Sequence, residues 1–596
     1  MSFTSFRFPA VDPHEFLRKP LRERLRILSV NWAENGFGSP GMVPTMYIAK
    51  LVFFYALCGV IIATATSGLQ FWHVSQWWNQ PIVYQKLILW TTLIEVIGVG
   101  GSWGPLAGKI KPMVGSIRFW TRPGTIRLRP FTWVPFTGGD RRTWFDVALY
   151  VGLLVSLVVA LLAPGAPSSS LLERLPDNTT GLVRPALMIA PIVLLIVLGL
   201  RDKVIFLAAR GEQYLPAFIF FAVLPFTDMI IALKILIVVA WVGAGVSKFG
   251  RHFSRVIGPM TSNSPLIPSK RFKLANYKKF PNDLSPTRLT EFLGHVLGTV
   301  VEILAPLVLL FSTNKTVTII GVIFMLGLHA FIISSFPMAV PLEWNVLFAY
   351  ASVFLFLGFP AWDGYSVFDM STPWLMPLIA ALLLFFPIFG SFRPDKVSFL
   401  PAMRQYAGNW ACSVWAFAPG AEEKLYKVTR PVKNTVDQFI DYGFEPQWAQ
   451  VTMQQPLAFR ALHSQGRGLF SVLIKNVPDI DTRTLRDGEF LCNCLIGFNF
   501  GDGHMHDERL VAAVQREVGF APGELIVVCN ESQAWGSSVQ HYKLIDAAVG
   551  VIETGTWKVI DAVSTQPWLP DGPIPTQTTW TRSSVESSEK NRGAHG

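Results

Sequence analysis

The stretch LKILIVVAWVGAGVSKFGRHF, residues 233–253, decides the fold class of this chain. The twelve positions from Ile235 to Val246 are all apolar or glycine, with Lys234 before them and Lys248 two residues after them. A helix of about 20 such residues crosses the hydrocarbon layer of a membrane, where lysine is among the costliest residues to hold. The stretch therefore predicts a membrane-spanning helix, whose two lysines are either surface anchors or working groups inside the membrane.

Apolar runs of this kind recur along the first two thirds of the chain. Of the 596 residues 51% are hydrophobic, and the mean hydropathy is +0.38, outside the usual range of soluble proteins. We predict an α-helical polytopic membrane protein with about nine transmembrane helices. They are expected at residues 47–66, 82–103, 144–163, 185–200, 217–246, 293–311, 316–336, 345–359 and 373–390.

After residue 393 the composition becomes that of a soluble protein, which divides the chain into four parts. They are a basic amphipathic, interfacial region (1–45), a transmembrane domain (46–393), a soluble α+β domain (394–575) and a disordered tail (576–596). Within the soluble domain, alternating apolar residues predict strands around a helix. The strands are expected at 469–476, 489–500, 524–530 and 551–563, and the helix at 506–518.

Residues 13–32 of the first part interleave leucines and Phe16 with arginines and lysines. This pattern is typical of a basic helix lying on an anionic leaflet. The alternative is a solvated helix packed on another domain.

Charge indicates which loops are cytoplasmic, because Lys and Arg accumulate there. Residues 104–143 carry eight Lys or Arg against one acid, whereas residues 67–84 carry neither Lys nor Arg. We therefore expect a cytoplasmic N-terminus and a multi-pass protein of the plasma membrane. The net charge of +11 lies mainly beside the predicted spans, which favours anionic lipid head groups as partners. No nucleic-acid-binding motif is visible.

The segment 249–290 disagrees with this alternation. One crossing by residues 217–246 would place it outside, yet it has eight Lys or Arg and one acid. Either the long run is broken at Leu224, Pro225 and Phe226 into a re-entrant arm and a helix, or the loop is outside despite its charge. The sequence leaves both possibilities open.

Six ionisable residues fall within the apolar runs and should point inward, where they find partners. They are Glu95, Asp228, Lys234, His295, Glu302 and His329. One interpretation is that they form struts between helices, such as Lys234 with Glu95 or Asp228. The other is that they form a site, in which Lys248 follows the small residues Gly243 to Gly245 and serves as a base.

Two stretches carry a resemblance to a known family. IVVAWVGAGVSKF (237–249) and HAFIISSFPMAVPLEWNVLF (329–348) resemble helices of the vitamin K-dependent gamma-carboxylase and the wider horizontally transferred transmembrane family. The resemblance implies that Lys248 is an active-site base and that His329 is its neighbour. Ser247 departs from the pattern, because the carboxylase has a second lysine there. The C-terminal third also does not resemble the carboxylase's substrate-binding region.

Over its full length, including SFLPAMRQYAGNWACSVWAF (398–417), the chain resembles uncharacterised multi-pass membrane proteins of actinobacteria.

The stretch GDGHMHDE (501–508) is the one candidate site in the soluble domain. On a strand, His504 and His506 would share a face and could bind a metal. The alternative, which the sequence favours, is a polar turn that caps the following helix.

Three functions are compatible with these features. The first is a membrane-embedded enzyme acting on a lipid, quinone or other apolar substrate, with Lys248 as base, His329 and His295 as proton carriers, and Glu302 or Asp228 orienting them. The second is a transporter or assembly partner for envelope lipids, and the third is a structural scaffold. The sequence does not decide whether the protein is an enzyme, and it indicates no particular cofactor or protein partner.

Overall fold

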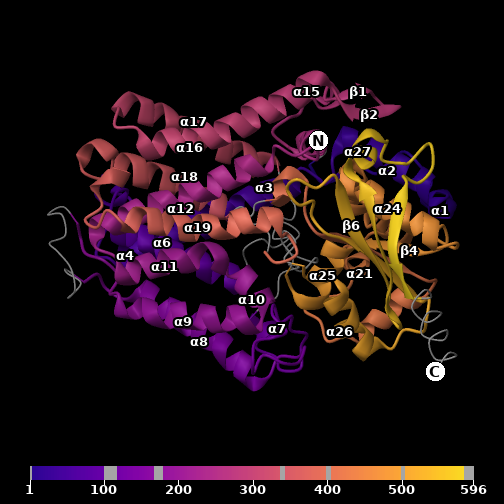
Figure 1. Ribbon diagram of the computed structural model, residues 1–596, viewed down its shortest axis with the longest axis horizontal. Coiled ribbons are helices and arrows are strands. Elements are labelled where there is room, and N and C mark those ends of the chain that lie inside the picture. The colour runs from indigo at the N-terminus through magenta and orange to yellow at the C-terminus, as the bar shows by residue number, and fades with distance from the viewer. Residues whose placement is uncertain are drawn as a thin grey trace, which may run out of the picture.

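The computed structural model describes residues 3–98, 117–166, 179–335, 343–397, 404–498 and 504–582. Two parts lie side by side along the long axis of the molecule (Figure 1). One is a bundle of helices, and the other contains an antiparallel sheet surrounded by shorter helices.

The bundle contains long helices that follow one another along the chain. They are α3 (Met42–Ala49) continuing through η1 (Lys50–Leu57) into α4 (Cys58–Ala65), α6 (Pro81–Val96), α8 (Trp144–Leu162), α9 (Ala186–Arg201), α11 (Gly211–Val223), α12 (Phe226–Ser247), α15 (Arg288–Leu293) continuing through η3 (Gly294–Val300) into α16 (Val301–Phe311), α17 (Lys315–Ser335), α18 (Glu343–Val353) continuing into η4 (Phe354–Gly358), and α19 (Leu375–Phe392).

Six of these helical segments are long and apolar enough to cross a membrane, and a bent pair makes a seventh. The six are Met42–Ala65, Trp144–Leu162, Phe226–Ser247, Arg288–Phe311, Lys315–Ser335 and Leu375–Phe392, and the pair is Glu343–Gly358 with Ala361–Asp369. The predicted count of nine is therefore not confirmed over the described ranges. Two predicted spans, 82–103 and 185–200, correspond to the shorter helices α6 and α9, each with 16 residues. The predicted span 217–246 is divided between α11, with 13 residues, and α12.

α12 is the helix that decided the fold class, and it packs against α11, α16 and α19. It follows Pro225, which has no backbone N–H and therefore suits the position before a helix. Near its other end a Cβ atom at Gly245 would lie 2.6 Å from Cγ1 of Ile303. Glycine at this position lets α16 approach α12 closely, which brings the end of α12 next to Glu302.

The chain breaks at Leu224 and Pro225, so α11 and α12 form a helical hairpin. α12 therefore returns the chain to the sheet-containing part, where residues 249–290 form α13 (Ser254–Asn263), α14 (Lys270–Leu274), β1 (Tyr277–Lys279) and β2 (Asp283–Pro286). There Trp32 Nε1 donates to the carbonyl of Pro259 at 3.2 Å, and Arg255 Nε donates to the carbonyl of Val563 at 3.1 Å. The basic segment thus lies at the same end as both the N-terminal and the C-terminal regions.

The N-terminal helices α1 (Pro13–Arg18) and α2 (Leu21–Asn35) pack on the C-terminal part. Phe16, Leu21 and Leu25 are buried in the same core as residues of α23 (Gln455–Leu462). The apolar stripe that suggested a membrane-surface helix is therefore covered by protein, as the alternative interpretation expected.

The C-terminal part is built on a six-stranded antiparallel sheet with strand order β4-β3-β5-β6-β7-β8. The strands are β3 (Cys412–Phe417), β4 (Thr484–Asp487), β5 (Leu525–Asn530), β6 (Val539–Asp546), β7 (Gly550–Lys558) and β8 (Thr576–Thr581). Both faces of β3 are buried: Trp415 and Phe417 belong to one core, and Val414 and Ala416 belong to the core shared with α1 and α2.

The structure corrects several predictions for this part. Residues 469–476 and 489–500, predicted as strands, lie largely in α24 (Ser464–Asn476) and α25 (Gly488–Ile496). The strand at 524–530 is confirmed as β5. The segment 551–563 divides into β7 and α27 (Val559–Ser564), and β8 lies within the predicted disordered tail. The tail after residue 582 lies outside the described residues.

Candidate functional site

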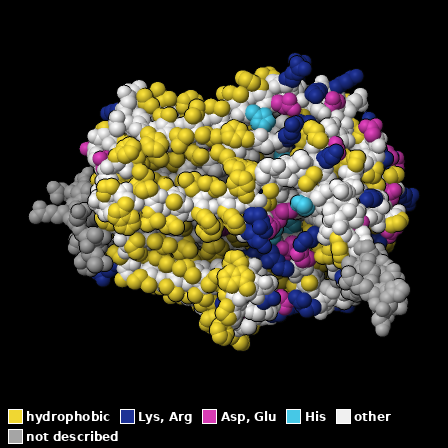
Figure 2. Space-filling view, viewed as in Figure 1, with side chains coloured by type: hydrophobic (Ala, Val, Ile, Leu, Met, Phe, Trp, Pro, Cys, Tyr) yellow, Lys and Arg dark blue, Asp and Glu magenta, His cyan; other side chains and the backbone are white. Residues whose placement is uncertain are grey.

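A cavity of about 1570 Å³ lies where the bundle meets the C-terminal part. Its apolar end is lined by α9, α11, α12 and α19, and its polar end by β5, β6 and the turn at residues 504–507. Figure 2 shows that hydrophobic side chains cover the bundle, whereas charged and histidine side chains gather at the boundary with the C-terminal part. The cavity therefore joins an apolar compartment to a polar one, which we call the groove and the chamber.

The floor of the groove is one face of α12. Leu236, Val239 and Ala240 line it, and their spacing of three and four residues places them on a single face of the helix. α11 and α19 both pack on α12, and they make few contacts with each other along their described lengths. Phe385 and Phe386 of α19 line the cavity and are each 55% exposed. The groove is therefore open on the side where the bundle presents apolar side chains outward.

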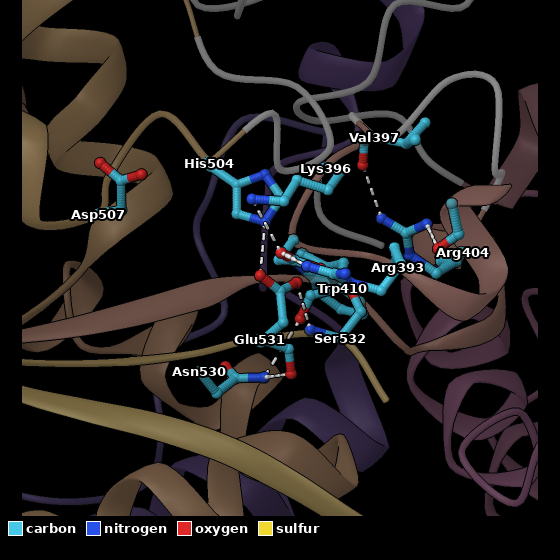
Figure 3. Close-up of polar contacts among 12 residues, drawn as sticks. Arg393, Lys396, Val397, Arg404, Trp410, His504, Asp507, Asn530, Glu531 and Ser532 are labelled. Atoms are coloured by element: carbon cyan, nitrogen blue, oxygen red, sulfur yellow. Dashed lines mark hydrogen bonds and ion pairs between the residues drawn. The ribbon is translucent and has the colours of Figure 1, made fainter. Parts of the chain in front are cut away.

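Two side chains of the chamber form a hydrogen-bonded pair (Figure 3). His504 Nε2 lies 2.7 Å from Oε2 of Glu531, the residue that follows β5. Lys203, at the start of α10 (Lys203–Ala208), donates from Nζ to the carbonyl oxygen of His504 at 2.7 Å. Burial would raise the pKa of Glu531, but the neighbouring His504 lowers it below its ordinary value. The pair can exchange a proton with a polar group bound beside it.

The turn that carries these residues caps the next helix, α26 (Glu508–Val518). The Asp507 side chain accepts from the backbone N–H of Arg509 at 2.9 Å and from Arg509 Nη2 at 2.7 Å. Burial would raise the pKa of Asp507, but the charges of Lys203 and Arg509 lower it to about 2. The predicted polar capping turn is thus present.

A second histidine of this turn is more deeply buried. His506 is 2% exposed and lines the cavity, and its Nδ1 lies 2.9 Å from Oγ of Ser413. Its Nε2 is buried and has no hydrogen-bond partner in the described part of the chain. Burial lowers the pKa of His506 to about 3, so the ring is neutral at physiological pH.

These two histidines do not form the metal site that a strand would have provided. Residues 504–506 form a turn, in which His504 has a φ of 51°, so the two side chains do not share a strand face. Over the described residues, no group of three or more His, Cys, Asp or Glu side chains is arranged to hold a metal ion. Residues 501–503 of the motif lie outside those ranges.

The five residues predicted to form a catalytic site are not brought together at the cavity, and none of them is among its lining residues. Lys248 forms a buried ion pair with Glu302. Asp228 accepts hydrogen bonds from the backbone N–H of Ser371 at 2.8 Å and from its hydroxyl at 2.6 Å. His295 is half-buried and lies edge-on to the ring of Phe253. Of these five residues, only Lys248 and Glu302 form an ion pair with each other.

Both ring nitrogens of His329 are engaged. Trp241 Nε1 donates to His329 Nε2 at 3.1 Å, and His329 Nδ1 donates to Asn345 Oδ1 at 3.0 Å. Because the tryptophan N–H can only donate, His329 is the neutral tautomer with its proton on Nδ1. The two hydrogen bonds connect α17 to α12 and to α18.

Lys234 does not pair with Glu95 or Asp228, as one interpretation expected. Its Nζ donates to the carbonyl of Tyr365 at 2.6 Å, while Glu95 lies 3.3 Å from Nε of Arg210. Glu95 and Glu302 have charged partners, Arg210 and Lys248, that differ from those predicted, and Lys234 bonds a neutral carbonyl instead of an acid.

Sequence reasoning missed Lys203, Ser413 and Glu531. Each lies in a different segment, and no local motif connects them with the turn at His504. The one available signal was the polar turn itself, for which the sequence favoured helix capping over a metal site.

The fold and the cavity define a polytopic membrane protein in which a helical bundle and a sheet-containing part share an amphipathic compartment. The chain belongs to a family described as transmembrane protein of unknown function (DUF3556), whose model matches residues 1–579. No curated protein and no solved structure matches the chain. The family match covers both the bundle and the sheet-containing part.

Proposed function

We propose that the protein binds a lipid, quinone or other membrane amphiphile, with its apolar chain in the groove and its polar group in the chamber. The observation that carries the proposal is the continuity of the two compartments in one cavity of about 1570 Å³. Ligand pockets commonly measure about 300–1,000 Å³, so this cavity has room for a long-chain molecule.

The open side of the groove supports lateral access from the bilayer. An apolar chain that slides between α11 and α19 exchanges one apolar environment for another, and it meets the half-exposed phenylalanines of α19 on the way. The polar group then reaches the chamber without crossing the full hydrocarbon layer.

The chemistry available in the chamber is proton transfer. The carboxylate of Glu531 orients His504, an arrangement that suits a general acid or base acting on a bound hydroxyl, carbonyl or ester. An enzyme acting on the bound amphiphile is therefore the activity that this arrangement supports. The carboxylase-like role of Lys248 as a base would place the chemistry elsewhere, because Lys248 pairs with Glu302 outside the cavity.

The distribution of charge supports a plasma-membrane protein with this chamber on the cytoplasmic side. Basic residues of the segments 3–41, 117–143 and 249–290 lie at the end of the bundle that carries the C-terminal part. By the positive-inside rule this end faces the cytoplasm, where these basic segments meet anionic lipid head groups.

Lipid analysis of the purified full-length protein tests the function. Ala240→Trp fills the groove and should remove the amphiphile that copurifies with the wild-type protein, as measured by extraction and mass spectrometry. Val155→Trp is the matched control, because Val155 is 56% exposed on α8 and does not line the cavity. If both variants retain the same lipids as the wild type, the groove is not the binding site.

A further inference from the structure

The direction of the hydrogen bond between His506 and Ser413 decides which ring nitrogen of His506 carries the proton. Ser413 Oγ accepts from Trp415 Nε1 at 3.1 Å and lies 2.9 Å from His506 Nδ1. If the Ser413 hydroxyl donates to Nδ1, both groups are satisfied and the ring proton lies on Nε2. The opposite tautomer would leave the hydroxyl proton and the Nε2 lone pair both without partners. We therefore assign the proton to Nε2.

His506 Nε2–H is then a buried donor, on a residue that lines the cavity, with no acceptor in the described part of the chain. An unpaired buried donor costs free energy, so a bound oxygen acceptor at this position would be stabilised. The histidine therefore selects a ligand that offers an oxygen lone pair.

The charges of the chamber indicate what kind of oxygen this is. Among the described lining residues, five cations are matched in number by five carboxylates. The cations are Lys203, Arg393, Lys396, Arg509 and Lys543, and the carboxylates are Glu212, Asp395, Asp507, Glu508 and Glu531. An additional anion would therefore enter a chamber whose positive charge is already balanced. Burying a charge without a counter-ion is costly, whereas an uncharged oxygen needs only the donor.

We infer that the chamber binds an uncharged polar group with an oxygen acceptor, a carbonyl or a hydroxyl, which accepts a hydrogen bond from His506 Nε2. Neutral amphiphiles such as quinones and diacylglycerols carry such groups, whereas phosphatidic acid and free fatty acids are anionic. This inference rests on the proposed binding of an amphiphile in the groove.

A matched pair of lipids tests the inference on the full-length protein in detergent. Diacylglycerol and phosphatidic acid with identical chains differ only in the phosphate, and a long-chain quinone serves as a second neutral probe. We expect at least one neutral probe to bind at least tenfold more tightly than phosphatidic acid. Equal or tighter binding of phosphatidic acid overturns the inference.

Substitutions of His506 test the donor itself. His506→Phe removes the donor and should weaken binding of the neutral probe about three- to tenfold, the range for one lost hydrogen bond. His506→Gln retains an N–H donor and should recover part of the affinity. His541→Phe is the control, because His541 also lines the cavity but is exposed. Unchanged binding in a folded His506→Phe protein overturns the inference.

The groove variant separates the two proposals. If no neutral probe binds, or if His506→Phe has no effect, while Ala240→Trp still removes the copurifying lipid, the assignment of the polar group is wrong and the proposed function stands. If Ala240→Trp changes nothing, the proposed function falls, and the inference falls with it.

Discussion

Lys203 and His504 are joined across 301 residues of sequence by a hydrogen bond of 2.7 Å from the lysine Nζ to the histidine carbonyl. The bond links the segment after α9 to the turn that forms the chamber, and it fixes the position of the His504 ring relative to the groove.

Lys203→Met should therefore loosen the junction. Lys203 is 7% exposed, and removal of its amine takes away the donor to the His504 carbonyl and one of the two positive charges near Asp507. We expect a loss of about 1–3 kcal/mol in the free energy of unfolding, measured by thermal unfolding of the purified protein. Lys543→Met is the control, since its pair with Glu508 is largely exposed and should contribute little. Equal stability of the two variants would contradict the assigned role of Lys203.

Lys248→Ala should act mainly on stability. The pair with Glu302 is buried, and a carboxylate left without its partner costs about 3–5 kcal/mol. We expect lower thermal stability in Lys248→Ala and recovery in the double variant Lys248→Met with Glu302→Gln. A Lys248→Ala protein with unchanged stability and no cellular activity would instead support the role of a base.

Stability should fall as the pH falls from about 6.5 to 4. Burial lowers the pKa of His252 from 6.5 to about 4 and that of His463 to about 3. In this interval the unfolded chain binds protons that the folded protein does not, so the stability present above pH 6.5 is lost toward pH 4.

For His252 the loss at pH 4 is on the order of 3 kcal/mol. His252→Gln should therefore show a shallower dependence of the melting temperature on pH between 6.5 and 5. An identical dependence in the variant would refute this assignment.

The topology of the chain gives a further prediction. Residue 270 begins α14 and residue 420 follows β3, both in the part of the molecule that the chain reaches after the end of α12. Residues 80 and 365 lie near the other end of the bundle, where Lys234 contacts Tyr365 and Gly358 lies close to Asn79. Reporter fusions after residues 270 and 420 should therefore give a cytoplasmic signal, and those after 80 and 365 an external one. An external signal at 270 would show that the hairpin of α11 and α12 does not return the chain to its starting side.

The sequence predicts the bundle well where the apolar runs are long. α12 was expected from residues 217–246 and is present from Phe226, with the break at Leu224 and Pro225 that one alternative proposed. The prediction fails in the C-terminal part, because α24 and α25 are buried on nearly all sides. Complete burial removes the polar face that distinguishes a helix of period 3.6 from a strand of period 2.

The chamber could not be predicted from the sequence, because its parts come from residues near 203, 413, 504 and 531. Only tertiary contacts bring these segments together. The intramembrane acids and bases were expected to pair with one another, whereas Glu95 lies beside Arg210 and Glu302 pairs with Lys248, which was predicted as a base. The partner of Lys234 is a backbone carbonyl, which carries no signal in the sequence.

The burial of α1 and α2 against α23 determines when the N-terminal region can complete its fold during synthesis. Arg24 Nη1 lies 3.4 Å from Oε1 of Gln454, a residue 430 positions later. At about 5–20 residues per second the ribosome needs roughly 20 to 90 s to make the intervening chain. Throughout that time Phe16, Leu21 and Leu25 lack their protein partners, and the nearest apolar surface is the bilayer that receives the first helices. The apolar stripe of α1 and α2 is thus suited to lie on the membrane surface during synthesis and to pack on α23 in the finished protein.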